Sequence, residues 1–230
     1  IKIDNENKLI WKNNPIARLK KGNDYLSPEI EIIADESLNT ESESKLMSFL
    51  NKWLSNFINE VLGDLINLTK HKIENQYLRG LLFQLYENNG VIKRNEVDKI
   101  VKLIPAEERK KLWGMGVKIG RYHIYLPKML KPKAVDFRVS LWKLFYNIPN
   151  KNKIPQSGLN FLVSKNFEKD FLLLCGFEKF REFFVRIDIL EKLFIKIIEN
   201  TKDRKFKINA EMMNLLGCSK ENFYKLMIYM

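Results

Sequence analysis

The stretch LMSFLNKWLSNFINEVLGDLI, residues 46–66, carries the strongest structural pattern in the chain. Its apolar residues recur every three or four positions, which is the spacing of one face of an α-helix. This stripe consists of Leu46, Phe49, Leu50, Trp53, Leu54, Phe57, Ile58, Val61, Leu62, Leu65 and Ile66. Upstream, Thr40 and Glu43 have the spacing of a capping box. We therefore predict a long helix whose apolar stripe, including Trp53, lies in the core.

Four further helices are predicted downstream from the same apolar spacing. They cover 75–88, 95–103 and 105–114, and the last begins at Pro132. Asn95 is expected to be the N-cap of the second of these helices, because its side chain can accept a hydrogen bond from the first turn. Closely spaced helices with short connections favour a helical bundle.

Two parts of the chain alternate apolar and polar residues, as half-buried strands do. Near the N-terminus, short strands are predicted at 9–11, 15–19 and 29–34, where turns rich in Asn, Gly and Pro separate them. Two more short strands are predicted within 117–126, on either side of Gly120. These strands interrupt a sequence that is otherwise helical.

The C-terminal part predicts a smaller unit. Residues 148–163 contain two prolines, a glycine and clustered Asn and Lys, which is typical of a linker. Beyond it, Asn209 and Ser219 are expected to cap two short helices. Two helices joined in this way have the outline of a helix–turn–helix motif, which also occurs in many proteins that do not bind DNA. We predict a mainly α fold: a helical bundle with short strands near the N-terminus and around 117–126, plus a small C-terminal α+β unit. The expected parts are a strand segment at 1–38, a bundle with a basic β-hairpin at 39–147, a linker at 148–163 and a helical unit at 164–230.

The positive charge of the chain is concentrated in one region. The 230 residues carry a formal net charge of +12. A bias from an AT-rich genome would spread lysine along the chain, yet 1–40 and 41–90 each have a net charge of −1. Residues 91–160 hold 16 basic and 5 acidic residues. A localised basic field is what binding to a polyanion requires.

The basic segment between Arg109 and Lys153 contains 12 Lys or Arg residues and one acid, Asp136. Single-stranded nucleic acid is bound by cations that neutralise phosphates and by exposed rings that stack on bases. A solvated helix face with its aromatic rings packed inward is the alternative interpretation. The candidate contact residues are Lys118, Arg121, Tyr122, His123, Lys128, Lys131, Lys133 and Arg138.

Motifs of common catalytic sites are missing from the sequence. There is no G-x-x-x-x-G-K-[ST], H-E-x-x-H or G-x-S-x-G, and no cluster of Cys and His. Cys175 and Cys218 are expected to be reduced thiols of a cytoplasmic protein. No apolar run approaches the roughly 20 residues that span a bilayer. We expect no catalytic residues, no metal ligands, no bound cofactor and no membrane contact in this chain.

Several phrases of the sequence resemble a known family. The chain is similar to the C-terminal region of bacterial superfamily 2 helicases, the proteobacterial relatives of the mitochondrial degradosome RNA helicase. The most specific phrases are GVKIGRYHIYLPKMLKP at 116–132 and VRIDILEKL at 185–193. The others are NPIARLKKGNDYLSPEIEIIADESL at 14–38, GLLFQLYENNGVIKR at 80–94 and MMNLLGCSKENFYKLM at 212–227.

The resemblance implies a role beside a motor. In such helicases two upstream RecA-like domains carry the ATPase motifs, with ATP and Mg²⁺, and the largely helical region after them helps to form the nucleic-acid path. The chain begins at Ile1, so we expect it to be part of a longer protein. We predict a non-catalytic accessory region that binds RNA or other single-stranded nucleic acid. The alternative is a protein–protein interaction module that docks partners such as a nuclease.

Overall fold

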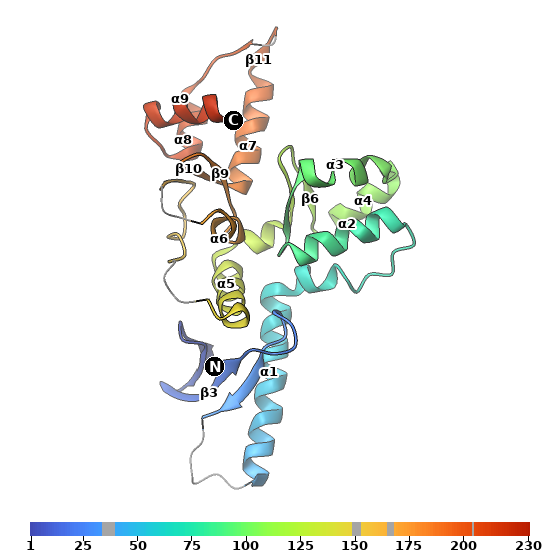
Figure 1. Ribbon diagram of the computed structural model, residues 1–230, viewed down its shortest axis with the longest axis vertical. Coiled ribbons are helices and arrows are strands. Elements are labelled where there is room, and N and C mark those ends of the chain that lie inside the picture. The colour runs from blue at the N-terminus through green and yellow to red at the C-terminus, as the bar shows by residue number, and fades with distance from the viewer. Residues whose placement is uncertain (34–39, 149–152, 165–167, 204) are drawn as a thin grey trace. The chain divides into compact units, whose positions relative to one another are not determined.

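The computed structural model describes residues 1–33, 40–148, 153–164, 168–203 and 205–230 (Figure 1). The fold is mainly α with small antiparallel sheets of short strands, as the sequence predicts. In the part of the chain that is described, no helix combines the length and the apolar character needed to cross a membrane. Cys175 and Cys218 are both free thiols.

The chain forms two compact units. Unit 1 consists of Ile1–Gly63 and Asp136–Lys153, and unit 2 consists of Asp64–Val135 and Ile154–Met230. The single bundle expected at 39–147 is therefore divided between the two units. Residues 149–152 of the expected linker and the expected boundary at 38 lie outside the described residues.

Unit 1 contains a four-stranded antiparallel sheet in the order β1-β2-β3-β4. The strands are β1 (Lys2–Ile3), β2 (Lys8–Trp11), β3 (Asn14–Lys20) and β4 (Glu29–Ile32). The three predicted strands are confirmed, and β1 adds a short edge beside β2. Leu9, Ala17 and Leu19 are buried on the same face of the sheet, because Leu9 is the cross-strand partner of Ala17 and residues two apart on a strand share a face.

The long predicted helix is confirmed as α1 (Thr40–Asn67). Leu50 and Leu54 are buried, but Phe49 is exposed. Trp53 is half-buried and stacks on Phe57 at 5.3 Å between ring centroids, so the prediction that Trp53 lies in the core is met only in part. The apolar stripe is wider than the face of the helix that the protein buries.

Helix α5 (Pro132–Tyr146) begins at the predicted proline. Its Phe137 packs edge-on against Phe57 of α1, with 5.0 Å between centroids, and both rings belong to unit 1. Val139 and Leu141 are also buried. These contacts explain why part of α5 belongs with α1 and the N-terminal sheet.

After the last residues of α1, unit 2 contains three of the predicted helices. They are α2 (Gln76–Glu87), α3 (Arg94–Leu103) and α4 (Ala106–Gly114). Asn75 caps α2 by accepting two backbone N–H bonds at 3.0 Å. The prediction that Asn95 caps α3 was wrong: α3 begins at Arg94, and Lys93 precedes it as the last residue of a strand.

Unit 2 also contains a three-stranded antiparallel sheet, with the order β5-β7-β6. Its strands are β5 (Val91–Lys93), β6 (Lys118–Ile119) and β7 (His123–Tyr125), and the 3₁₀ helix η1 (Pro127–Leu130) comes next. The predicted hairpin within 117–126 is confirmed. The central strand β7 also pairs with β5, a strand that the sequence did not predict.

The rest of unit 2 contains a second small sheet, β8-β10-β9, and the last helices. The strands are β8 (Phe161–Val163), β9 (Phe177–Phe180), β10 (Phe183–Arg186) and the pair β11 (Thr201–Lys202) and β12 (Lys205–Phe206). The helices are α6 (Lys169–Leu174), α7 (Ile187–Glu199), α8 (Ala210–Leu216) and α9 (Lys220–Tyr229).

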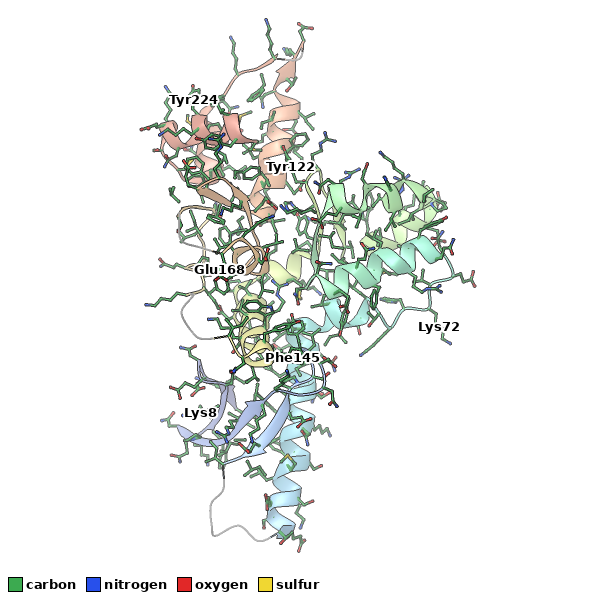
Figure 2. The ribbon with its side chains drawn as sticks, in the orientation of Figure 1. Lys8, Lys72, Tyr122, Phe145, Glu168 and Tyr224 are labelled. Atoms are coloured by element: carbon green, nitrogen blue, oxygen red, sulfur yellow. The ribbon has the colours of Figure 1, made fainter. Side chains whose placement is uncertain are left out.

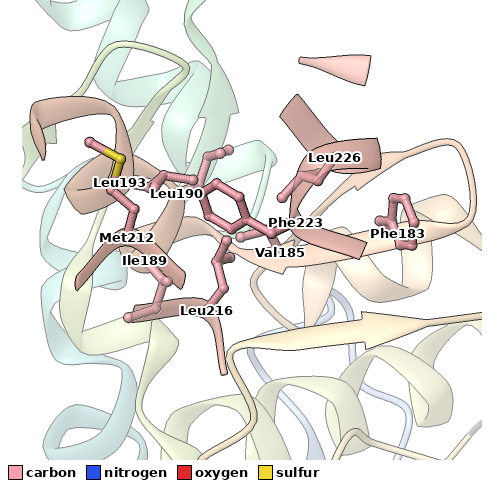
Figure 3. Packing of buried hydrophobic residues seen from close by; sticks show 9 residues of the cluster. All are labelled: Phe183, Val185, Ile189, Leu190, Leu193, Met212, Leu216, Phe223 and Leu226. Carbon is pink, nitrogen blue, oxygen red and sulfur yellow. The ribbon is translucent and has the colours of Figure 1, made fainter. Parts of the chain in front are cut away.

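Side chains from β10, α7, α8 and α9 meet in one apolar cluster (Figure 3). Leu190, Met212 and Phe223 are fully buried in it. The predicted caps are confirmed, because Asn209 and Ser219 accept backbone N–H bonds at 3.0 and 3.2 Å. The C-terminal helices therefore have a core of their own within unit 2.

Candidate nucleic-acid interface

Only some of the candidate contact side chains on the hairpin β6–β7 are exposed. Lys118 is the cross-strand partner of Tyr125, and Lys93 is the partner of His123. Cross-strand partners lie on the same face of a sheet, so these four side chains share one face. Tyr125 and His123 are buried there, whereas Lys118 is exposed at the edge strand.

The turn between the two strands wraps around a carboxylate from α7. Three consecutive backbone N–H groups, those of Arg121, Tyr122 and His123, donate hydrogen bonds to the Glu191 side chain at 2.5, 2.9 and 2.9 Å. Consecutive N–H groups that converge in this way form a cavity suited to an anion. Glu191 fills it, so the backbone of this turn is closed to an external phosphate.

Gly120 makes the close approach of Glu191 possible. A Cβ atom at this position would overlap the Glu191 carboxyl group. On the other side of the turn, Arg94 holds two carbonyl oxygens: its side chain donates to that of Gly120 at 2.7 Å, and its backbone N–H donates to that of Tyr122 at 2.8 Å. The turn at 120–123 is thus bound from both sides.

His123 lies in a buried network of charges. Its side chain is 1% exposed, and its Nε2 atom is 2.8 Å from Oε2 of Glu178. Glu178 also accepts from Nζ of Lys93 at 2.5 Å. An oxygen of Glu191 lies 3.6 Å from Nδ1, too far for a hydrogen bond but near enough for charge attraction. His123 cannot contact a nucleic acid from this position, so that prediction was wrong.

The network shifts the protonation of its members. Burial alone lowers the pKa of His123, but the hydrogen bond with Glu178 and the charge of Glu191 outweigh it and raise that pKa. Burial tends to raise the pKa of both carboxyl groups, yet their hydrogen bonds with His123, Lys93 and the turn N–H groups lower it. A protonated His123 gives the network two positive and two negative charges, which balances the charges that are removed from water.

The exposed cations of unit 2 are the candidates that remain. Lys118, Arg121 and Lys131 are exposed, and none of them forms an ion pair among the described residues. The Arg121 guanidinium lies over the Phe194 ring of α7, 5.5 Å from its centroid. Lys133 is exposed as well, and Lys128 pairs with Asp64 at 3.0 Å on the surface. Surface pairs of this kind contribute little and exchange readily.

Two other candidates are placed differently from the prediction. Tyr122, which is labelled in Figure 2, is half-buried. Its ring packs edge-on against Phe194 with 5.4 Å between centroids. That contact ties the ring to the protein, and burial raises the pKa of its hydroxyl. Arg138 belongs to unit 1, where its side chain is fully buried, so the prediction that it contacts a strand was wrong.

Sequence reasoning missed the two glutamates that organise the hairpin. Glu178 and Glu191 lie 55 and 68 residues beyond His123, and nothing in their local sequence marks them as partners of that residue. Glu191 lies in the phrase 185–193, and its hydrogen-bond donors lie in the phrase 116–132. The structure joins these two phrases through the Glu191 carboxylate.

No protein-family model, no curated protein and no solved structure matches this chain. The resemblance to superfamily 2 helicases therefore stays a prediction. Among the residues with described positions, no group of His, Cys, Asp and Glu side chains could hold a metal ion. What remains is a fixed hairpin tip with exposed cations beside it.

Proposed function

We propose that this chain is a non-catalytic accessory region of an ATP-dependent helicase and that its unit 2 binds single-stranded nucleic acid, RNA in particular. The observation that carries the proposal is the presence of three exposed cations, Lys118, Arg121 and Lys131, that form no ion pair with any described residue and lie on or just after a hairpin whose tip is bound on both sides. Under this proposal the region acts in the cytoplasm beside RecA-like domains that bind ATP and Mg²⁺.

Unpaired lysines and arginines are suited to phosphates for an electrostatic reason. Elsewhere in unit 2, cations such as Lys102, Lys196 and Lys225 have carboxylate partners at 2.6–2.7 Å. The carboxylate beside such a cation offsets its charge, so this cation attracts a phosphate less strongly than a cation without such a neighbour. Lys118 and Lys131 have none among the described residues, so a strand can displace their counterions directly.

The fixed turn favours a defined contact. Glu191 and Arg94 hold the backbone from which the Arg121 side chain extends. Preorganised groups lose less conformational entropy when a ligand binds. The filled N–H cavity has a further consequence: in this proposal only side chains meet the strand, so their number sets the salt dependence of binding.

The test is the salt dependence of binding to a labelled single-stranded RNA. Three phosphate contacts give a slope of about −2 in log affinity against log salt, at about −0.7 per contact. Replacing Lys118, Arg121 and Lys131 together with Ala should weaken binding of every sequence and remove most of that slope. Far-ultraviolet circular dichroism and the melting temperature of the variant check that it is folded.

A matched control is the triple variant Lys102→Ala, Lys196→Ala and Lys225→Ala. It loses the same formal charge from unit 2, but from side chains that already have carboxylate partners. This control should bind RNA with nearly the parent slope. Equal losses in both variants would mean that net charge alone attracts RNA, and the hairpin would have no special role.

The rival function is a protein-docking module, and one observation favours it. Ile195 and Ile198 of α7 and Ile228 of α9 are more than half exposed, and exposed apolar side chains are common at protein interfaces. If RNA binding is absent, or unchanged in the hairpin variant, this rival takes the place of the proposed function.

A further inference from the structure

The most exposed tryptophan of the described chain lies inside the basic segment. Trp113, near the end of α4, is 73% exposed, whereas Trp53 and Trp142 are half-buried. Its neighbour Leu112 is fully buried, so α4 packs through that side and directs the indole outward. Within the described residues no ring or cation contacts the Trp113 indole.

Arg109 is placed next to this ring by the helical repeat. Residues four apart lie on the same face of a helix, so Arg109 and Trp113 are neighbours on the surface of α4. Lys110 and Lys111 form ion pairs with glutamates of the same helix, at 2.9 and 2.6 Å. Arg109 is exposed and forms no ion pair among the described residues.

The end of α4 leads directly into the hairpin. The N–H of Gly116 donates to the carbonyl of Trp113 at 3.0 Å, and that of Val117 donates to the carbonyl of Leu112 at 2.9 Å. Lys118 then begins β6. The exposed ring therefore sits five residues before the first exposed cation of the hairpin, on backbone that is held by hydrogen bonds.

We propose that Trp113 is a base-stacking platform for single-stranded nucleic acid and that Arg109 binds a phosphate beside it. This inference rests on the proposed function. An indole face stacks on any base, and a neighbouring cation suits the phosphate of the same strand. The charge of the part of this segment that lies in unit 2, eight basic residues and no acid over 109–135, favours this occupant over a protein surface. Tyr122, the ring expected from sequence to stack, is already engaged by Phe194.

The experiment compares two exposed tryptophans. Trp113→Ala should weaken binding of a labelled single-stranded RNA about 5- to 150-fold and leave the salt slope unchanged. Trp11→Ala is the control, because Trp11 is 52% exposed in unit 1, where residues 1–40 have a net charge of −1. It should bind RNA as the parent does. Arg109→Ala should reduce the slope by about 0.7, the value of one contact.

Tryptophan fluorescence gives a second readout, and it uses conservative Trp→Phe substitutions that preserve the fold. RNA stacked on Trp113 should quench part of the emission, and Trp113→Phe should lose that quench while retaining most of the affinity. Trp11→Phe should keep the quench. Parent-like affinity for Trp113→Ala, with no quench assigned to Trp113, overturns the stacking inference.

The two proposals can fail separately. If Trp113→Ala binds as the parent does while the Lys118, Arg121 and Lys131 variant loses binding, the platform is wrong and the proposed function stands. If the parent shows no salt-dependent RNA binding, both are wrong, and the exposed indole belongs to a protein-docking surface.

Discussion

The N-terminal sheet of unit 1 and the sheet β5-β7-β6 of unit 2 both carry charged pairs, but in opposite surroundings. In the first, Glu31 of β4 accepts hydrogen bonds from Arg18 and Lys20 of the adjacent strand, and all three side chains are at least one-third exposed. In the second, His123 is 1% exposed and its partners Glu178 and Glu191 are 9% exposed. Water screens the first set of charges and is excluded from the second.

The difference teaches which charges hold the fold and which are available to a ligand. Exposed pairs contribute between zero and about 1 kcal/mol, because solvent competes for both partners. A buried network is costly to break, because removal of one member leaves another without compensation. In unit 2 the buried charges therefore fix the hairpin, and only exposed ones such as Lys118 can serve a partner.

Removal of the Glu191 carboxylate should have the largest effect on stability. Glu191→Ala should lower the free energy of unfolding by about 3–5 kcal/mol, because His123 and three backbone N–H groups lose their acceptor or counter-charge. Urea denaturation measures the change. Glu31→Ala is the matched exposed control and should leave the unfolding midpoint nearly unchanged. Similar midpoints for the two variants would contradict the contrast between the sheets.

Gly120→Ala should have the next largest effect. Its added methyl group would overlap the Glu191 carboxylate, and overpacking of this kind costs about 1–3 kcal/mol. Gly63→Ala is the control: Gly63 lies inside α1 with no atom within 4 Å of an added Cβ. That variant should gain about 0.5–1 kcal/mol from helix propensity. Urea denaturation of both variants checks the opposite signs.

The buried network also predicts a pH dependence of stability. The pKa of His123 is raised above its ordinary 6.5, so the folded state holds this proton more tightly than the unfolded state does. Its stabilisation is complete below pH 6.5 and is lost as the pH rises through the raised pKa. The pKa values of Glu178 and Glu191 lie below their ordinary 4.5, so their stabilisation is present above pH 4.5 and lost in acid.

Unfolding midpoints measured from pH 4 to pH 9 check this prediction. Stability from these groups should be greatest between about pH 4.5 and 6.5. His123→Gln should remove most of the decline on the alkaline side, whereas His71→Gln, at an exposed position, should keep it. A decline of the same size in His123→Gln would mean that other groups cause it.

These contrasts show how far the sequence predicts the structure. Strands β2, β3 and β4 pair with neighbours in the chain, and α1 repeats one apolar pattern over many turns, so local patterns were sufficient. The strand β5 was missed because its partner β7 lies about 30 residues away and only three residues pair. Asn95 was mistaken for a cap because β5 continues directly into α3.

For the candidate site, the sequence predicted the segment but not the side chains. Charge counting found the basic residues of 109–153, because charge is a property of composition. It could not find that His123 is buried, because the acids around it come from β9 and α7. Charge counting also could not show that Trp113 is a better candidate than Tyr122 for stacking on a base. The reason is that the ring contacting Tyr122, Phe194, comes from α7.

The last prediction concerns ATP hydrolysis, for which no activity is expected. Because the sequence lacks a segment that can hold a triphosphate, the purified chain should hydrolyse ATP at the background rate, with or without RNA. A phosphate-release assay measures this rate. Turnover that persists through further purification and is lost in a hairpin variant would make the chain an enzyme, contrary to the proposed accessory role.

The central claim is that a single strand lies along α4 and the hairpin of unit 2. The most direct measurement is photo-crosslinking of the 230-residue chain to a single-stranded RNA that contains 4-thiouridine, followed by mass spectrometry of the linked peptides. We predict crosslinks within residues 109–133, centred on Trp113 and the exposed cations, that disappear at high salt. Crosslinks confined to α7 and α9, or to the N-terminal sheet, would contradict the account.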